Sequence, residues 1–238
     1  MDERRLDSVM IRVDGSPLEE ALYDAMQLVR VEESVQLPDE FVIRFDDPFF
    51  AVFDAGTFTM GTAIEIAFRA EGDLVVVTSG EITSLVVDQP AGGRHQLVVQ
   101  GLDPSHRMAK GPKTRTFMQM SASDVVAQIA GDYGFETNVE STSLVLDYQL
   151  QANQTDYAYC RQLAIRHGFE LWFAENTLHF GPRPTAANQP GALEWGDNLQ
   201  KFRVRFSSTE RCDEVRVRGW DAGGARTIDG LATDGHTG

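Results

Sequence analysis

Apolar and polar residues alternate in several short segments of the first hundred residues, as they do in a β-strand with one buried face. The segments FVIRF and TAIEIAF both follow this pattern. In DLVVVTSGEITSLVV, Ser79-Gly80 separates two β-branched runs, which is typical of a turn. Residues 8–103 are therefore predicted to be mostly antiparallel β, with a barrel as one arrangement and one short helical stretch near Leu18–Tyr23.

A helical pattern begins in SASDVVAQIAGDYG. Ser121 is placed to cap this helix, and Asp124 follows three residues later, as in a capping box. The helix should end near Gly131 or Gly134, where glycine favours termination.

A second helix is predicted in NQTDYAYCRQLAIRHG, with Thr155 or Asn153 as its cap and Gly168 at its left-handed end. The next residues, FELWFAENTLHF, have the pattern of a hairpin that turns at Glu175-Asn176. Two helices and a hairpin are thus expected between β-rich segments.

The last part of the chain begins with GPRPTAANQPG, whose proline, glycine and asparagine residues indicate an exposed connector. Alternation resumes in KFRVRF and EVRVRGW, where β-strands are predicted. The final residues have little to bury, so we expect a ragged end or a continuation into a further segment.

Length and composition indicate a folded protein of two linked units. The chain has 238 residues, of which 42% are hydrophobic and 24% are charged. It has no apolar run long enough to span a bilayer and no secretion signal, so no membrane anchor is expected. Cys160 and Cys212 are expected to be reduced, buried thiols of a protein made and folded in the cytoplasm.

The formal net charge is −15, and the first half carries most of it. Residues 1–105 contain 20 acidic and 7 basic side chains, whereas residues 106–238 contain 16 and 14. Nucleic-acid binding needs Lys and Arg against phosphates, so a nucleic-acid partner is not expected. The acidic residues form either an ordinary solvated surface or a face that steers assembly.

Cys160 and His167 are the first candidates for catalysis, because a thiolate and an imidazole can form a nucleophile and its base. Seven helical residues separate them, or roughly 10 Å of rise, so the two side chains cannot easily meet. Cys160, Leu163, Ala164 and His167 instead form one helical stripe, which predicts a packed face.

No other pattern indicates a catalytic, metal or cofactor site. Metal-binding spacings of Cys and His, a phosphate-binding loop and a nucleophile elbow are all missing from the sequence. The adjacent carboxylates Asp46 and Asp47 would point to opposite faces of a strand. Trp172 alternates with Phe173, so one of the two should be exposed, and we favour a protein interface there over a sugar platform.

Three stretches in this order resemble the hub proteins of contractile tails. They are GEITSLVVD, VVQGLDPSHRMAKGPKTRTFMQMSASDVVAQIAGDYGF and QTDYAYCRQLAIRHGFELWFAENTLHFGP, and VRVRGWD follows them. The similar proteins are phage late control protein D, the hub portion of VgrG spike proteins, and their counterparts in extracellular contractile injection systems.

The resemblance implies a mainly β fold with inserted helices. It implies two related antiparallel β-barrel domains, residues 1–105 and 106–238, and an insertion of helices and a hairpin at about 121–180 in the second. Three copies would form a homotrimer with a pseudo-sixfold ring, which docks on a hexameric inner tube. On the other side the family continues into a trimeric spike, which this sequence does not reach.

The implied partners are the inner tube protein, the spike tip and baseplate proteins, within a phage tail-like particle or a type VI or related secretion apparatus. For the subunit interface we predict Trp172 and the FRVR segment of Phe202, Arg203, Val204 and Arg205. In this hypothesis the two arginines meet carboxylates of another subunit. The competing functions are a tail-associated cell-wall hydrolase and a carbohydrate-binding module.

Overall fold

The fold is mainly β with a few helices, as predicted, and the chain divides into two units, Met1–Thr185 and Ala186–Gly238. The computed structural model describes residues 9–34, 37–70, 73–89, 94–174, 176–182, 214–221 and 223–233. Of the residues singled out in the sequence, the FRVR segment at 202–205 and Cys212 lie outside these ranges.

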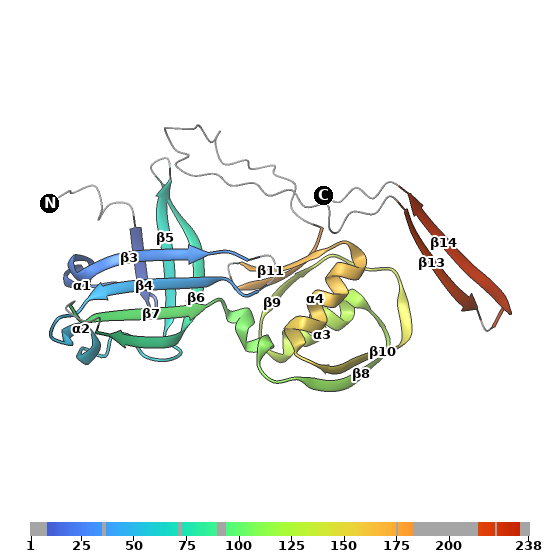
Figure 1. Cartoon of the computed structure of the whole chain (residues 1–238), viewed down its shortest axis with the longest axis horizontal. Coiled ribbons are helices and arrows are strands. Elements are labelled where there is room, and N and C mark those ends of the chain that lie inside the picture. The colour runs from blue at the N-terminus through green and yellow to red at the C-terminus, as the bar shows by residue number, and fades with distance from the viewer. Residues whose placement is uncertain are drawn as a thin grey trace. The chain divides into compact units, whose positions relative to one another are not determined.

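A seven-stranded antiparallel sheet forms the first part of the first unit. Its spatial order is β2 (Ser16–Pro17), β1 (Val9–Val13), β5 (Ala63–Ala70), β6 (Asp73–Asp88), β7 (Gln96–Leu102), β4 (Glu40–Asp46) and β3 (Met26–Glu32). Figure 1 shows β1 and β5 crossing the direction of β3, β4 and β7. No pairing among the described strands closes this sheet into a barrel.

Strand β6 joins the two halves of the sheet, because it pairs with β5 up to Glu81 and with β7 from Glu81 onward. The predicted turn at Ser79-Gly80 is therefore wrong: both residues lie inside a continuous strand of 16 residues. Glycine is needed at position 80 for another reason. A Cβ there would lie 2.5 Å from the carbonyl oxygen of Leu102, so the glycine permits a close approach of two backbones.

The apolar faces of the crossing strands enclose one hydrophobic core. FVIRF lies in β4 and most of TAIEIAF lies in β5, as predicted. Their alternating apolar side chains are buried, except that Phe68 is only partly buried. Two short helices, α1 (Glu20–Ala25) and α2 (Ala51–Asp54), add Leu22 and Val52. Helix α1 overlaps the predicted helical stretch. The core consists of Ile11, Leu18, Leu22, Phe41, Ile43, Phe45, Val52, Phe58, Ile64, Ile66, Ile82, Leu97 and Val99.

The second part of the same unit begins after the 3₁₀ helix η2 (Pro104–Ala109). Strands β8 (Lys113–Ser121) and β10 (Val145–Gln154) form a two-stranded antiparallel ribbon. Strands β11 (Glu170–Ala174), β12 (Thr177–Gly181) and β9 (Glu136–Val139) form a second sheet, in which β12 and β9 are parallel. Helices α3 (Ala122–Asp132) and α4 (Asp156–His167) share a second hydrophobic core with these strands.

The helix ends of this part follow the sequence prediction. Ser121 and Asp124 form the capping box of α3. Thr155 caps α4, whose left-handed end is Gly168 at φ 67°. The two hydrophobic cores, residues 11–99 and 108–180, lie on either side of the predicted domain boundary at residue 105, which itself stays a prediction.

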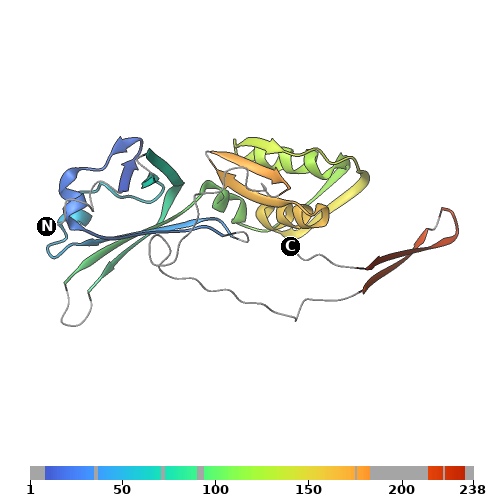
Figure 2. The same cartoon turned by 90° about the horizontal axis from the view of Figure 1, so that it is seen from above.

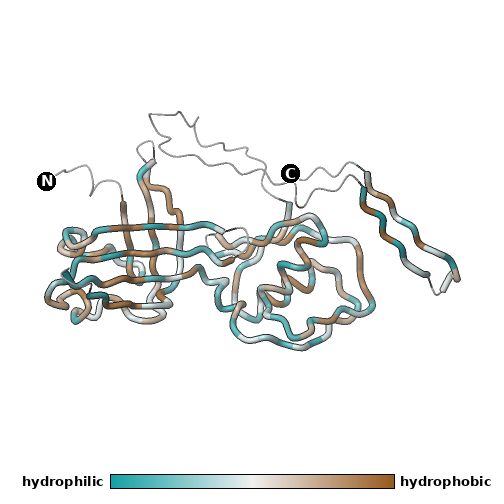
Figure 3. Tube along the Cα trace, viewed as in Figure 1, coloured by the Kyte–Doolittle hydropathy of each residue, from teal (hydrophilic) through white to brown (hydrophobic). Residues whose placement is uncertain are grey.

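The described part of the second unit is a hairpin of β13 (Glu214–Asp221) and β14 (Arg226–Thr233). β13 was predicted from EVRVRGW. Nearly every side chain of the hairpin is exposed, and Figure 3 shows hydrophobic and hydrophilic positions mixed along both strands. A two-stranded hairpin is marginal on its own, so its apolar side chains call for a further packing partner.

Gly101 and Gly131 give a matched test of the close approach in the sheet. A Cβ at Gly101 would lie 2.1 Å from Cζ of Phe41 and 2.3 Å from the carbonyl oxygen of Glu81, whereas Gly131 on α3 has nothing within 4 Å. Gly101→Ala should lower the free energy of unfolding by about 1–3 kcal/mol or more. Gly131→Ala should raise it by about 0.5–1 kcal/mol. Urea denaturation measures both, and an unchanged midpoint for Gly101→Ala would contradict the described packing.

Candidate assembly surface

The first unit has a cleft of about 620 Å³ between two strands that belong to different sheets. One wall is β6 at Val75–Ser79, and the other is β11. Figure 2 shows the strands of the first sheet, in blue and green, and β11 and β12 of the second sheet, in orange, as separate groups. Among the described strands, Val75–Ser79 pairs only with β5, and β11 is an edge strand of its sheet. The cleft therefore lies between two strand edges.

Carboxylates line the same cleft, namely Glu33, Asp39 and Asp103. The backbone N–H of Asp39 donates to Oδ2 of Asp103 at 2.5 Å, and the N–H of Ser105 donates to its Oδ1 at 2.7 Å. The N–H of Ser34 donates to Oδ1 of Asp39 at 2.8 Å. These bonds connect the loop between β3 and β4 to the end of β7, and they hold two acidic side chains at the cleft.

The acidity of the two aspartates is shifted by their surroundings. Burial raises the pKa of Asp39 to about 6; the hydrogen bond from Ser34 opposes the shift, and the charges of Asp103 and Glu33 add to it. Burial also raises the pKa of Asp103, although its hydrogen bonds from Ser105 and Asp39 oppose the change. A nearby cation would therefore favour the ionised form of both aspartates.

Trp172, one of the predicted interface residues, lies in β11 and lines the cleft. It is half-buried, its neighbours Leu171 and Phe173 are buried, and its ring stacks on His179 at a centroid distance of 4.7 Å. Trp172 is thus the more exposed residue of the Trp172–Phe173 pair. Its place in a subunit interface stays a prediction, as does that of the FRVR segment outside the described residues.

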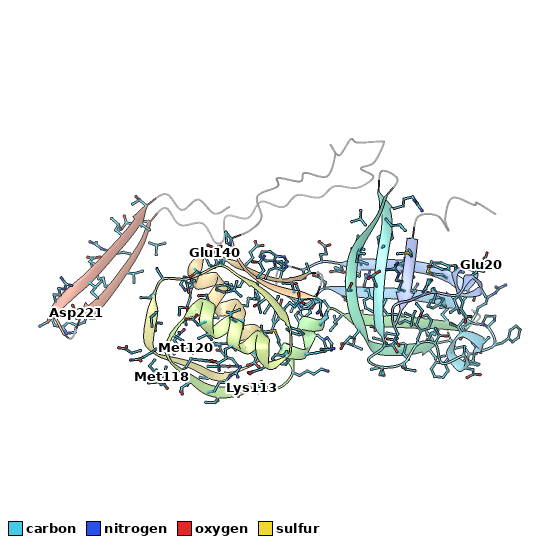
Figure 4. All side chains as sticks on the ribbon, turned by 180° about the vertical axis from the view of Figure 1, so that it is seen from behind. Glu20, Lys113, Met118, Met120, Glu140 and Asp221 are labelled. Atoms are coloured by element: carbon cyan, nitrogen blue, oxygen red, sulfur yellow. The ribbon has the colours of Figure 1, made fainter. Side chains whose placement is uncertain are left out.

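A second surface, the ribbon face, was missed by sequence reasoning. It consists of Met118 of β8 with Leu146, Tyr148 and Leu150 of β10, all of them exposed. Tyr148 is 54% exposed and pairs directly with Met118. Figure 4 labels Met118 and Met120 on this ribbon. Large apolar side chains that share one exposed sheet face are typical of a surface that binds another protein.

The polar side of the ribbon, in contrast, points into the protein. Gln151 is 0% exposed, and Gln149 is also buried. Nε2 of Gln149 donates to the carbonyl oxygen of Met120 at 2.8 Å, and Nε2 of Gln151 donates to Asp156 at 2.8 Å. The alternation in VLDYQLQ predicts a strand. It also predicts that the apolar face is buried, whereas the structure buries the face that carries the glutamines.

Asp156 is the centre of a buried ionic network that holds the ribbon to the helices. Its Oδ1 accepts hydrogen bonds from Arg115 at 2.7 Å and from Gln151, and its Oδ2 accepts from Lys113 at 2.6 Å and from Tyr133 at 2.7 Å. Burial alone would raise the pKa of Asp156, but the hydrogen bonds and the charge of Arg115 lower it overall. The carboxylate is fully engaged, so we interpret the network as structural.

The Cys160–His167 pair occupies the positions expected of a packed helix face. Cys160, Leu163 and Ala164 are buried, and burial raises the pKa of the Cys160 thiol, which favours the unreactive protonated form. His167 is half-buried in the last turn of α4, where its ring lies 5.9 Å from that of Phe169. The stripe is confirmed for three residues and is only partly buried at the fourth.

The remaining acidic candidates have separate structural tasks. Asp46 pairs with Arg94 at 2.9 Å, while Asp47 is buried and accepts hydrogen bonds from the backbone N–H groups of Val52 and Phe53, both at 3.0 Å. Within the described ranges, no cluster of His, Cys, Asp and Glu has the arrangement of a metal site. No helix of the described residues is long and apolar enough to cross a membrane.

The comparisons with known proteins identify a family and a fold. The profile of the family described as the Alg8 N-terminal domain matches residues 5–237. A search of curated proteins finds no match. The 43 kDa tail protein of prophage MuSo2 from Shewanella oneidensis has a similar structure, with 16% identity and a TM-score of 0.68 over 97% of this chain and 70% of that chain.

Two further structures are similar. For a tail protein from Neisseria meningitidis MC58, the identity is 16% and the TM-score 0.67, over 97% of this chain and 68% of that one. For a chain of the Francisella PdpA–VgrG complex, the identity is 10% and the TM-score 0.50, over 90% of this chain and 34% of that one. At these identities the likeness concerns the fold, which is that of phage tail proteins.

Asp39→Asn tests the acidic cleft through its effect on stability. The pKa of Asp39 is about 6 in the folded chain and 3.8 ordinarily, so the folded chain holds this proton more tightly between those pH values. Stability therefore falls as the pH rises through this window, and the substitution should remove that loss. We expect Asp39→Asn to raise the free energy of unfolding by about 1 kcal/mol at pH 7.5, after discounting for partial exposure, and by almost nothing near pH 4.

The matched control is Asp54→Asn on the exposed surface of α2. This change should alter the free energy of unfolding by less than about 0.5 kcal/mol at either pH. Denaturant curves at both pH values measure the effect. A destabilised Asp39→Asn variant at pH 7.5 would contradict the assignment of an unfavourable buried charge.

Proposed function

Because the chain belongs to the Alg8 N-terminal domain family and has the fold of phage tail proteins, we propose that it is the structural hub of a contractile injection apparatus. In this role three copies form an adaptor that joins a hexameric inner tube to a trimeric spike. The observation that carries the proposal is the match to tail proteins over nearly the whole chain. The ordered motifs that resemble tail hubs support it independently.

The surfaces of the first unit suit a protein that works by packing against others. The ribbon face exposes Met118, Leu146, Tyr148 and Leu150, although nothing in a monomer needs four large apolar side chains in water. The proposed partners are two further copies of the chain, the inner tube protein, the spike tip and baseplate proteins. The proposed place of action is a tail-like particle or secretion apparatus, assembled after synthesis in the cytoplasm.

The paired barrels are part of this proposal. The two halves of the seven-stranded sheet cross each other, and we propose to assign the first barrel to them. The second barrel is assigned to residues 106–238, with the segment at about 121–180 inserted in it. Each copy would then contribute two similar elements, so that three copies make a ring of nearly sixfold symmetry.

We further propose that the chain acts without catalysis. Among the described residues, the Asp156 network groups several charged side chains, and its carboxylate already accepts four hydrogen bonds within the fold. A tail-associated cell-wall hydrolase would need a free acid and base in a cleft, whereas Asp39 and Asp103 at the cleft accept hydrogen bonds from backbone N–H groups of Ser34, Asp39 and Ser105. A carbohydrate-binding module would need exposed aromatic platforms. Trp172 is half-buried and stacked on His179, so it favours neither alternative.

Native mass spectrometry of the full chain tests the hub directly. We expect a species of three times the monomer mass of 26.4 kDa, and end-on class averages by electron microscopy should show pseudo-sixfold symmetry. A monomer at all concentrations up to about 100 μM, where specific subunit contacts are populated, would contradict the proposal.

The ribbon face should strengthen this trimer. Leu146→Ser and Leu150→Ser remove exposed apolar side chains, so they should change the stability of the monomer by less than about 0.5 kcal/mol. If each side chain becomes buried on assembly, each substitution should weaken association by about tenfold or more. Asp147→Ser, on the opposite side of the same strand, is the control that should leave association nearly unchanged. Sedimentation across a dilution series measures all three, and equal affinities would exclude the ribbon face from the interface.

A further inference from the structure

We propose that the cleft between β6 and β11 is a slot for an added β-strand, and that strand β13 of a second copy of this chain occupies it. The inference rests on the proposed oligomer and identifies one contact within it. It follows from three observations: two strand edges at the cleft, carboxylates beside them, and a strand with complementary side chains elsewhere in the same chain.

The strand edges determine the kind of ligand. Val75–Ser79 of β6 has β5 on one side and no described strand on the other, since pairing with β7 starts only at Glu81. β11 is likewise bonded to β12 alone among the described strands. Such edges present a row of backbone donors and acceptors, which an extended segment satisfies by joining the sheet. Val75 and Val76 are also nearly half exposed, so an added strand would cover apolar surface.

The carboxylates determine the charge of the ligand. Glu33, Asp39 and Asp103 all line the cleft, and Asp39 and Asp103 are partly or largely withdrawn from water. Two neighbouring acidic groups in such a place repel each other and lack solvation. A strand with arginines at alternate positions would neutralise them and would form charge-assisted hydrogen bonds.

Strand β13 has both properties on its one free edge, since β14 pairs with the other edge; β13 would therefore bond to β6, with β11 as the opposite wall of the slot. Val215, Arg216, Val217 and Arg218 alternate and are exposed. The arginines contact Asp229 only at the surface, at 3.0 and 3.9 Å, and exposed ion pairs of this kind contribute little. Alternation would direct the valines to one side of the slot and the guanidinium groups to the other.

The partner strand of the same hairpin is a poorer match. β14 has the sequence RTIDGLAT, in which Asp229 would enter an acidic slot and Arg226 is the sole basic residue. Val215 and Val217 pair with Ala232 and Gly230, so this part of one hairpin face carries no charge and can rest on the exposed valines of β6, while the Asp221–Arg226 pair lies at the other end of the same face. Both the charge and the apolar pattern thus select β13.

Cross-linking between two differently tagged copies tests the contact. One copy carries Val76→Cys and the other Val217→Cys, and both carry Cys212→Ser so that each has one new thiol beside the buried Cys160. A short bifunctional maleimide should join the two copies. In the matched control, Phe49→Cys replaces Val76→Cys. Phe49 is 84% exposed and does not line the cleft, so at least tenfold less product is expected from it.

Charge exchange tests the same contact without cysteines. Arg218→Glu and Glu33→Arg should each raise the dissociation constant of the assembly by about tenfold at low salt. The double variant should return to within about threefold of the original value, because the pair is restored with reversed signs. Arg226→Glu on β14 is the control and should change the constant by less than about threefold.

The outcomes separate this inference from the proposed function. Cross-linking between copies together with rescue by the double variant supports the slot. A trimeric mass without cross-linking or rescue overturns the slot and leaves the hub intact. A product that forms only when both cysteines are on the same chain also overturns it, because the donor is then not a second copy. A chain that stays monomeric overturns the hub and this inference together.

Discussion

The change of partner along β6 is the constraint on which the rest of the first unit depends. One continuous strand pairs with β5 over its first half and with β7 over its second, so it joins two groups of strands that run across each other. This is possible because Gly80 and Gly101 have no side chain where Leu102, Glu81 and Phe41 come close. A larger residue in place of either glycine would collide with these groups and push the strands apart.

The same geometry creates the functional surfaces. Where β6 leaves β7 to follow β5, its Val75–Ser79 edge has no further described neighbour, and β11 lines the opposite wall of the resulting cleft. On the ribbon face, the Asp156 network draws Gln151 inward, so that Leu146, Tyr148 and Leu150 point outward. The buried network and the exposed apolar side chains therefore arise from the same interactions, which fits the proposed role in assembly.

Local sequence patterns predicted the local structure well. The capping residues Ser121 and Thr155, the left-handed Gly168 and the alternating strands β4 and β5 were all recognisable, because each depends on neighbours within a few residues. The turn at Ser79-Gly80 failed for a physical reason. Glycine serves equally for a tight turn and for a close approach of distant backbones, and only the partner at Leu102 distinguishes the two.

The candidate surfaces were harder to predict, because they depend on residues far apart in the chain. Asp39 and Asp103 are separated by 64 positions, and nothing local to either indicates that they share a cleft. The ribbon reverses the usual rule that apolar side chains are buried and polar ones exposed. Burial of Gln149 and Gln151 becomes favourable only because Met120 and Asp156 accept their hydrogen bonds.

Hydrogen–deuterium exchange at β6, followed on the full chain at concentrations where it is dispersed and where it is assembled, tests the central claim most directly. We expect the amides of Val75–Ser79 that do not bond to β5 to exchange rapidly in the dispersed chain and to become protected on assembly. Equal exchange of these amides in an oligomer and in the dispersed chain would contradict it.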